Sequence, residues 1–183
     1  MTTTNTFLQG QKAFLGGHLK ESIKAFSTAL EEGIHPFHSH LNRGIAYLKI
    51  GQFTRAINDF NAIIEKDSIH ERALFYRGIA RLNLGQHKEA IHDLDRSLIL
   101  NPDRGVAHLA RGLAHHALGH KEEEERDIHD RHALHDVELG GFMEEYIISE
   151  SLFNQTLSFF TDDDAIWNLS LTEDEVLRMD TVH

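Results

Sequence analysis

The sequence contains no cysteine, and its 183 residues include only two prolines. The missing thiols exclude disulfide scaffolds, iron–sulfur clusters, thiol nucleophiles and cysteine-ligated zinc. No stretch approaches 18 uninterrupted apolar residues, and the most apolar one, residues 142–160, is interrupted by three glutamates. The first residues also lack the basic region and the apolar core of a signal peptide. We therefore expect a cytoplasmic protein that does not insert into a membrane.

Basic residues are scarce as well, with 18 lysines and arginines against 29 acidic residues and a net charge of −11. This balance argues against unaided nucleic-acid binding. The 40% of hydrophobic and 26% of charged residues are typical of a globular protein, and the low proline content favours a helical one. The one excess is in histidine, since 15 histidines outnumber the 13 glycines.

Glycine recurs with a period of 34 residues. Eight of the 13 glycines fall in two series with this spacing. The first series is Gly10, Gly44, Gly78 and Gly112, and the second is Gly17, Gly51, Gly85 and Gly119. The flanking residues repeat too, because segments 43–46, 77–80 and 111–114 read RGIA, RGIA and RGLA. The chain is therefore predicted to consist of tandem repeats.

Each repeat is predicted to be a helical hairpin. The first glycine lies inside a helix and costs about 1 kcal/mol relative to alanine, which is tolerated where a partner helix leaves no room for a Cβ atom. The second glycine supplies the left-handed conformation that ends a helix. Ala56 and Phe60, four residues apart, belong to the inner stripe of the second helix. Because one hairpin cannot bury this stripe, the units are expected to stack into a solenoid.

This pattern resembles the tetratricopeptide repeat, which has small residues at positions 8 and 20, aromatic residues at 11 and 24, and proline at 32. The second unit has Gly44, Tyr47, Ala56 and Phe60 at the first four of these positions. The resemblance implies an all-α, right-handed superhelical solenoid of helix hairpins, closed by one or more C-terminal capping helices. The four units are expected at residues 3–36, 37–70, 71–104 and 105–136. The fourth is degenerate, because Glu124 stands at a position for a small residue.

The last quarter of the chain has a different composition. Residues 1–136 have a net charge of −1, whereas residues 137–183 hold eleven acidic residues and one basic residue, a net charge of −10. Apolar residues recur at helical spacing from Phe142 to Phe160, which predicts an amphipathic helix of roughly 20 residues. We expect residues 137–183 to form an acidic helical cap or tail on the fourth hairpin. Its alternatives are packing against a second protomer or into the concave groove.

No catalytic constellation is visible, so we expect a non-enzymatic protein without a cofactor. A phosphate-binding glycine loop and an exposed serine nucleophile are both missing from the sequence. Seven histidines cluster between residues 108 and 135. Among the late residues, His129, His132 and Asp136 stand at i, i+3 and i+7 on one helix face, and such groups suit zinc, nickel or copper. We expect that the protein binds no metal and that these are ordinary surface histidines. If a metal did bind, these three residues would be the candidate ligands.

The resemblance also implies where a partner would bind, because ligands of this family lie along the first helix of each unit, in a concave groove. Positions 2, 5, 6, 9, 12 and 13 of each unit point there, and some of them also pack on neighbouring helices. The candidate groove residues are Phe7, Gln11, Leu41, Asn42, Ile45, Arg72, Phe75, Tyr76, Ile79 and Leu109. Family members that grip the acidic C-terminus of heat-shock chaperones carry a clamp of Lys, Asn and Arg at five such positions. Here only Asn42 and Arg72 match, so the apolar lining better suits an extended or helical hydrophobic segment.

The sequence thus favours a protein–protein interaction module, an adaptor, chaperone-like protein or assembly scaffold that binds a peptide or helical segment in the groove. One alternative is a metal- or pH-responsive regulator that uses the histidine-rich fourth unit. Another is a scaffold that self-associates, as a homodimer, through the C-terminal tail.

Overall fold

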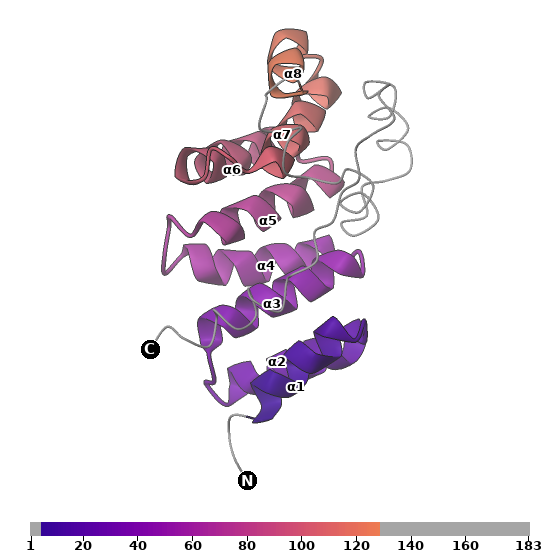
Figure 1. Ribbon diagram of the computed structural model, residues 1–183, viewed down its shortest axis with the longest axis vertical. Coiled ribbons are helices and arrows are strands. Elements are labelled where there is room, and N and C mark those ends of the chain that lie inside the picture. The colour runs from indigo at the N-terminus through magenta and orange to yellow at the C-terminus, as the bar shows by residue number, and fades with distance from the viewer. Residues whose placement is uncertain (1–4, 129–183) are drawn as a thin grey trace.

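The glycine-marked repeats form four helical hairpins. The computed structural model describes residues 5–128, which contain eight α-helices and no strand (Figure 1). They are α1 (Asn5–Leu15), α2 (Leu19–Glu31), α3 (Pro36–Lys49), α4 (Phe53–Ile64), α5 (Glu71–Asn83), α6 (His87–Leu100), α7 (Gly105–Leu118) and α8 (Lys121–Ile128). Each odd-numbered helix packs on the even-numbered helix that follows it, and successive hairpins pack on one another. The prediction of an all-α solenoid of helix hairpins is confirmed.

Residues 129–183 lie outside the described part of the chain. The predicted tail at 137–183 and the end of the predicted fourth unit fall there, so the division of the chain into 1–136 and 137–183 stays a prediction. Within the described part, α3 begins at Pro36, one residue before the boundary expected at 37.

The two glycine series have the two roles predicted for them. Glycines of the second series follow α1, α3, α5 and α7 and have φ values from 73° to 75°, the left-handed conformation that ends a helix. In the first series, a Cβ atom on Gly44 would lie 2.6 Å from Cε1 of Phe60. The corresponding distances are 2.7 Å from Gly10 to Phe26 and 2.9 Å from Gly78 to Leu94. The helices of a hairpin therefore meet where no side chain fits on the first helix.

An arginine in each of the last three hairpins ties that hairpin together and joins it to the preceding one. Arg77 of α5 donates from Nε and Nη2 to Asp93 of α6 at 2.8 and 2.6 Å, and from Nη1 to Asn61 of α4 at 2.7 Å. Arg43 bonds Asp59 and Ser27 in the same way, and Arg111 bonds Asp127 and Asp95. Every acceptor lies 16 residues from its arginine, either after it or before it. We call these three arginines and their acceptors the arginine ladder.

Sequence reasoning did not identify the arginine ladder, although its residues repeat at the period of 34. Arginine precedes the first-series glycine in the last three units, and an aspartate stands 16 residues after each of these arginines. The first unit has Gln9 and Ala25 at these positions, so the ladder begins in the second unit. Burial opposes the ionisation of Asp127, but the hydrogen bonds from Arg111 and the nearby imidazole of His108, 3.6 Å away, outweigh it and hold the pKa of Asp127 below its usual value.

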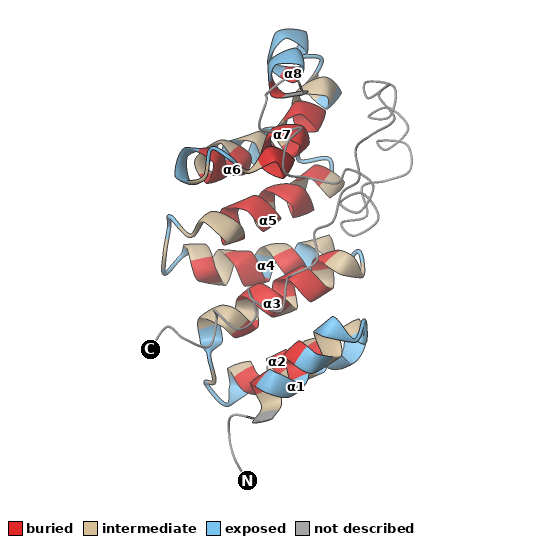
Figure 2. Cartoon of the chain, in the orientation of Figure 1, coloured by how far each residue is buried: buried red, intermediate tan, exposed pale blue. Residues whose placement is uncertain are grey.

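The buried side chains form two separate clusters. The larger one runs through α3 to α7, where the inner faces are buried (Figure 2). The smaller one, in the first hairpin, consists of Phe7, Phe26 and Ala29 with the partly buried Ile34 beside them. The first hairpin therefore has its own small core.

Replacing Gly44 by alanine is expected to lower the free energy of unfolding by about 1–3 kcal/mol, because the new Cβ would overlap the ring of Phe60. This loss occurs although alanine is the better helix former by about 1 kcal/mol. Chemical denaturation measures it. In a Phe60→Leu background, which removes Cε1 and Cζ, the same substitution should cost less. An equal cost in both backgrounds would show that the ring is not the obstacle.

Replacing Arg77 by methionine is expected to lower the free energy of unfolding by about 1.5–3 kcal/mol, because Asp93, which is fully buried, loses two charge-assisted hydrogen bonds. Arg81 still contacts Asp93 at 2.6 Å and limits the loss. The matched control is Arg55→Met, an exposed arginine outside the ladder, which should change stability by less than about 0.5 kcal/mol. Equal effects of the two substitutions, measured by urea denaturation, would contradict a structural role of the ladder.

Candidate partner-binding face

The odd-numbered helices line the inner side of the solenoid. Contacts between odd-numbered helices of successive hairpins (α1 with α3, α3 with α5, α5 with α7) are more extensive than those between the even-numbered ones. Because elements on the inside of a curve are closer together, α1, α3, α5 and α7 form the concave side and the even-numbered helices lie behind them. This is the side on which the sequence predicts the groove.

Nine of the ten predicted groove residues are buried, and the tenth, Arg72, is half-buried. Phe75, Ile79 and Leu109 have no exposed surface at all. The two amides among them, Gln11 and Asn42, are only 8% and 7% exposed. The structure therefore makes these residues part of the packing between helices, and their contact with a partner stays a prediction.

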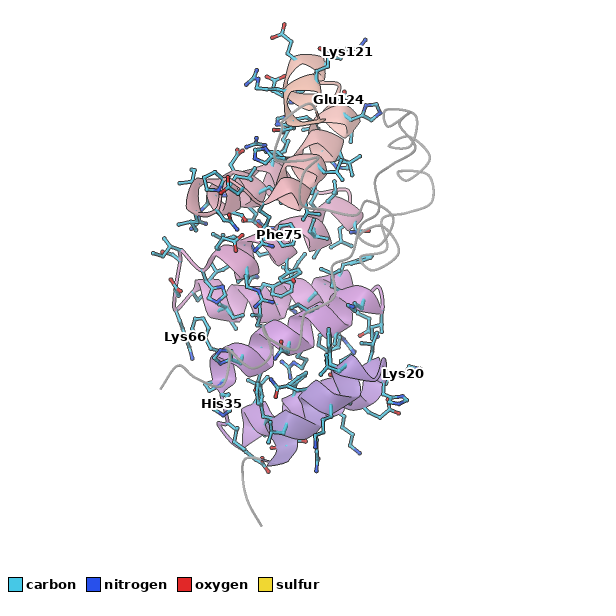
Figure 3. The ribbon with its side chains drawn as sticks, viewed as in Figure 1. Lys20, His35, Lys66, Phe75, Lys121 and Glu124 are labelled. Atoms are coloured by element: carbon cyan, nitrogen blue, oxygen red, sulfur yellow. The ribbon has the colours of Figure 1, made fainter. Side chains whose placement is uncertain are left out.

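The aromatic members of this set show what the packing is. Phe75, which lies in the middle of the stack (Figure 3), contacts the ring of Tyr76 with centroids 5.0 Å apart. Tyr76 in turn stacks on Phe60 of α4, 5.9 Å away. The guanidinium carbon of Arg104 lies 4.7 Å from the centroid of Phe75, at a distance that allows a cation–π interaction. These side chains join α4, α5 and the residue that precedes α7, which explains why groove positions are buried.

Apart from Arg72, the accessible side chains at the same six positions are not among the ten predicted groove residues. The large exposed apolar ones are at the first hairpin, where Leu8 is 38% and Leu15 is 53% exposed. The half-buried ones at these positions are Phe14, His38, Lys49, Arg72, Asn83 and His116. Lys49 reaches across to the first hairpin, with Nζ 5.2 Å from the ring centroid of Phe14. We call these eight residues the concave face.

None of the described residues at these six positions is acidic. The concave face has two cations, Lys49 and Arg72, and two histidines, in a chain whose net charge is −11. These six positions are therefore positive or neutral, whereas α8 exposes Glu122, Glu123 and Glu125.

The histidines of the fourth hairpin are partnered within it. His116 Nδ1 lies 2.7 Å from Oε1 of Glu124, and His115 Nδ1 lies 3.2 Å from Nδ1 of His120. His108 Nε2 lies 3.0 Å from the carbonyl oxygen of Pro102. Within residues 5–128, no group of three or more histidine, cysteine, aspartate or glutamate side chains could hold a metal ion. The predicted candidates His129, His132 and Asp136 lie outside these residues.

Burial lowers the pKa of His115. The carboxylates of Asp127 and Glu123 act in the opposite direction, while His120 and Arg111 add to the effect of burial, and the net result is a pKa below the usual value. Two imidazoles whose Nδ1 atoms are 3.2 Å apart can share one proton, but two charged rings would repel each other.

Glu124 explains how the fourth hairpin closes without a small residue. It occupies the position of Ala56 and Ala90 and is only 6% exposed, because its carboxylate is hydrogen-bonded to His116 of α7 (Figure 3 marks its place on α8). A polar pair thus replaces the close apolar contact of the preceding hairpins, which the sequence alone did not predict.

A tetratricopeptide repeat family model matches residues 41–103 and 78–133, which together are just over half of the chain. No curated protein matches the sequence. No helix within the described residues 5–128 has the length and apolar character needed to cross a membrane.

Several solved structures are similar to the chain. The first TPR domain of Spaghetti (RPAP3), bound to the HSP90 peptide SRMEEVD, is 26% identical with a TM-score of 0.60, over 64% of this chain and 93% of that one. The first TPR domain of human RPAP3 is 27% identical with a TM-score of 0.59, over 66% and 94%. A MamA structure has a TM-score of 0.65 over 86% and 87% of the chains, but at 21% identity it shows the fold alone. The sequence period of 34, the helical hairpins and the family-model match over residues 41–133 together show that the chain belongs to the tetratricopeptide repeat family.

Proposed function

We propose that the chain is a non-enzymatic interaction module, an adaptor, chaperone-like protein or assembly scaffold, whose concave face binds a segment of a protein partner. The observation that carries this is the row of accessible side chains on the odd-numbered helices of a repeat solenoid. The family relative that binds a peptide derived from HSP90 supports it, since that domain has the same fold over most of its length. We place the protein in the cytoplasm, as the sequence suggests.

The ligand we propose is an extended or helical segment with apolar side chains. Leu8, Leu15 and Phe14 at the first hairpin offer accessible apolar surface, whereas the polar groups of the face lie farther along, on α3, α5 and α7. A segment that crosses the face would place its apolar residues on α1 and its polar residues over Lys49 and Arg72. Repeat solenoids use their concave surfaces for this kind of extended binding.

A ligand identical to that of the HSP90-peptide relative is not our proposal. Of the five clamp positions, the chain has matching residues only at Asn42 and Arg72, and Asn42 is nearly buried. Phe7 and Tyr76, which stand at two other clamp positions, are core residues and lack the positive charge with which lysine or arginine would bind a carboxylate.

Peptides selected on the full-length chain from a random display library test this proposal. For the tightest peptides, Leu15→Glu is expected to weaken binding tenfold or more, because it removes a large exposed apolar contact of about 1.5–3 kcal/mol. The control, Ile99→Glu, replaces an apolar residue by glutamate at an even more exposed position, on the even-numbered helix α6. Titration calorimetry gives both affinities. Equal losses for both variants, or none for either, would place the binding surface elsewhere.

A pH-responsive role of the fourth hairpin is the second candidate, and the His115–His120 pair favours it. A homodimer through the tail and a metal site at residues 129–136 also stay proposals, because they depend on residues outside the described part.

The folded-state pKa of His115 is below its unfolded value, so the unfolded chain binds more protons as the pH falls below about 6.5. The free energy of unfolding should therefore decrease from about pH 6.5 downward, through the folded pKa. His115→Asn should flatten this decrease, although His70, whose pKa is also lowered by burial, keeps part of it. His18→Asn, at an exposed helix start, serves as the control. Urea denaturation between about pH 5 and 8 gives the slopes, and identical slopes for both variants would reject a role of His115.

A further inference from the structure

The concave face and the C-terminal part of the chain carry charges of opposite sign. The concave face holds Lys49 and Arg72 and no acidic residue among its described positions. Residues 142–169, which we call the tail segment, hold six acidic residues and no lysine or arginine. The same segment has six aromatic residues: Phe142, Tyr146, Phe153, Phe159, Phe160 and Trp167. The tail segment thus has the two properties, apolar side chains and negative charge, that suit the concave face.

We propose that the concave face binds the tail segment of the same chain, so that the protein carries its own competitor for the partner site. This inference rests on the proposed function, because it takes the concave face to be the binding surface. It adds the chemistry of the ligand, which is an acidic segment rich in aromatic residues. An external partner of the same chemistry would then have to displace the tail segment.

The connection is long enough for this contact. Residues 129–141 separate the end of α8 from the tail segment. If residues 129–136 are helical, as in the predicted fourth unit, this connection spans roughly 12 Å of helix and about 17 Å of extended chain, and it reaches roughly 45 Å if all of it is extended. Packed helices lie about 8–10 Å apart, so three steps from α7 to α1 cover roughly 30 Å. A tethered ligand also has an effective concentration on the order of millimolar, so that weak contacts are enough to hold it.

Charge alone does not account for the contact, because exposed ion pairs are weak and are screened by salt. The accessible apolar residues Leu8, Leu15 and Phe14 supply the second component, by covering aromatic side chains of the tail segment. The geometry therefore predicts an interaction that salt weakens but does not abolish.

Trp167 is the only tryptophan of the chain, so its fluorescence reports on the tail segment in the full-length protein. We expect the wild-type emission to be blue-shifted and protected from iodide quenching. Lys49→Glu combined with Arg72→Glu should shift it to the red and increase the quenching constant at least twofold. The control, Lys20→Glu combined with Lys66→Glu, makes the same charge change at exposed residues away from the concave face (Figure 3) and should leave the spectrum unchanged.

A second measurement locates the tail segment without destabilising the solenoid. Because the chain has no cysteine, a spin label at Asn168→Cys is the sole label. In NMR spectra, the label should broaden the amide signals of α3 and α5 more than those of α4 and α6, because it lies closer to the concave helices. The broadening should not change with protein concentration.

Three results would overturn the proposal: a solvent-exposed Trp167 in the wild type, broadening confined to the fourth hairpin, or broadening that depends on concentration, which would indicate a second copy. In each case the peptide experiment with Leu15→Glu still decides the proposed function, since it does not depend on the tail segment. Circular dichroism shows whether the double variant, Lys49→Glu with Arg72→Glu, is still folded. If it is not, the spin-label experiment, in which Lys49 and Arg72 are unchanged, decides whether the tail segment lies on the concave face.

Discussion

A register of 16 residues within each hairpin is the constraint on which the rest of the structure depends. The first-series glycine and the side chain that covers it are 16 residues apart, as in Gly44 and Phe60. The ladder arginine and its aspartate, one position earlier, have the same separation. The apolar contact allows the two helices to approach closely, and the charged contact beside it fixes their relative position along the helix axis. With this register in place, a sequence period of 34 produces the same hairpin four times.

Much of the fold could be predicted because its signals are local and periodic. Gly51 and Gly119 end their helices in the left-handed conformation, which few residues other than glycine adopt, so this signal can be read from the sequence alone. The pairing of Arg77 with Asn61 was harder to predict, because it joins two hairpins and depends on how far one is rotated against the next. The residues were visible at the right period, but a period does not show which side of a helix faces its neighbour.

The same limitation explains why most of the predicted groove residues are buried. Repeat position identified the helices that line the inner side of the solenoid, but not the side chains that remain accessible on them. Phe75 and Ile79 lie at positions expected to face a ligand and are fully buried, because the curvature of the stack brings α3, α5 and α7 together. Leu15 and Lys49 remain accessible. Residues at the ends of the concave helices are therefore better candidates for partner contact than those at their centres.

The arginine ladder is not uniform along the chain. The acceptors in the preceding hairpin change from the hydroxyl of Ser27 to the amide of Asn61 and then to the carboxylate of Asp95. The donor is a charged guanidinium in all three cases, so what changes is the acceptor, and only Arg111 reaches a carboxylate in the preceding hairpin. The first hairpin is distinguished by a small core of its own. In a linear array each unit contacts only its neighbours, so we expect this terminal hairpin to unfold while the hairpins that share the larger core stay folded.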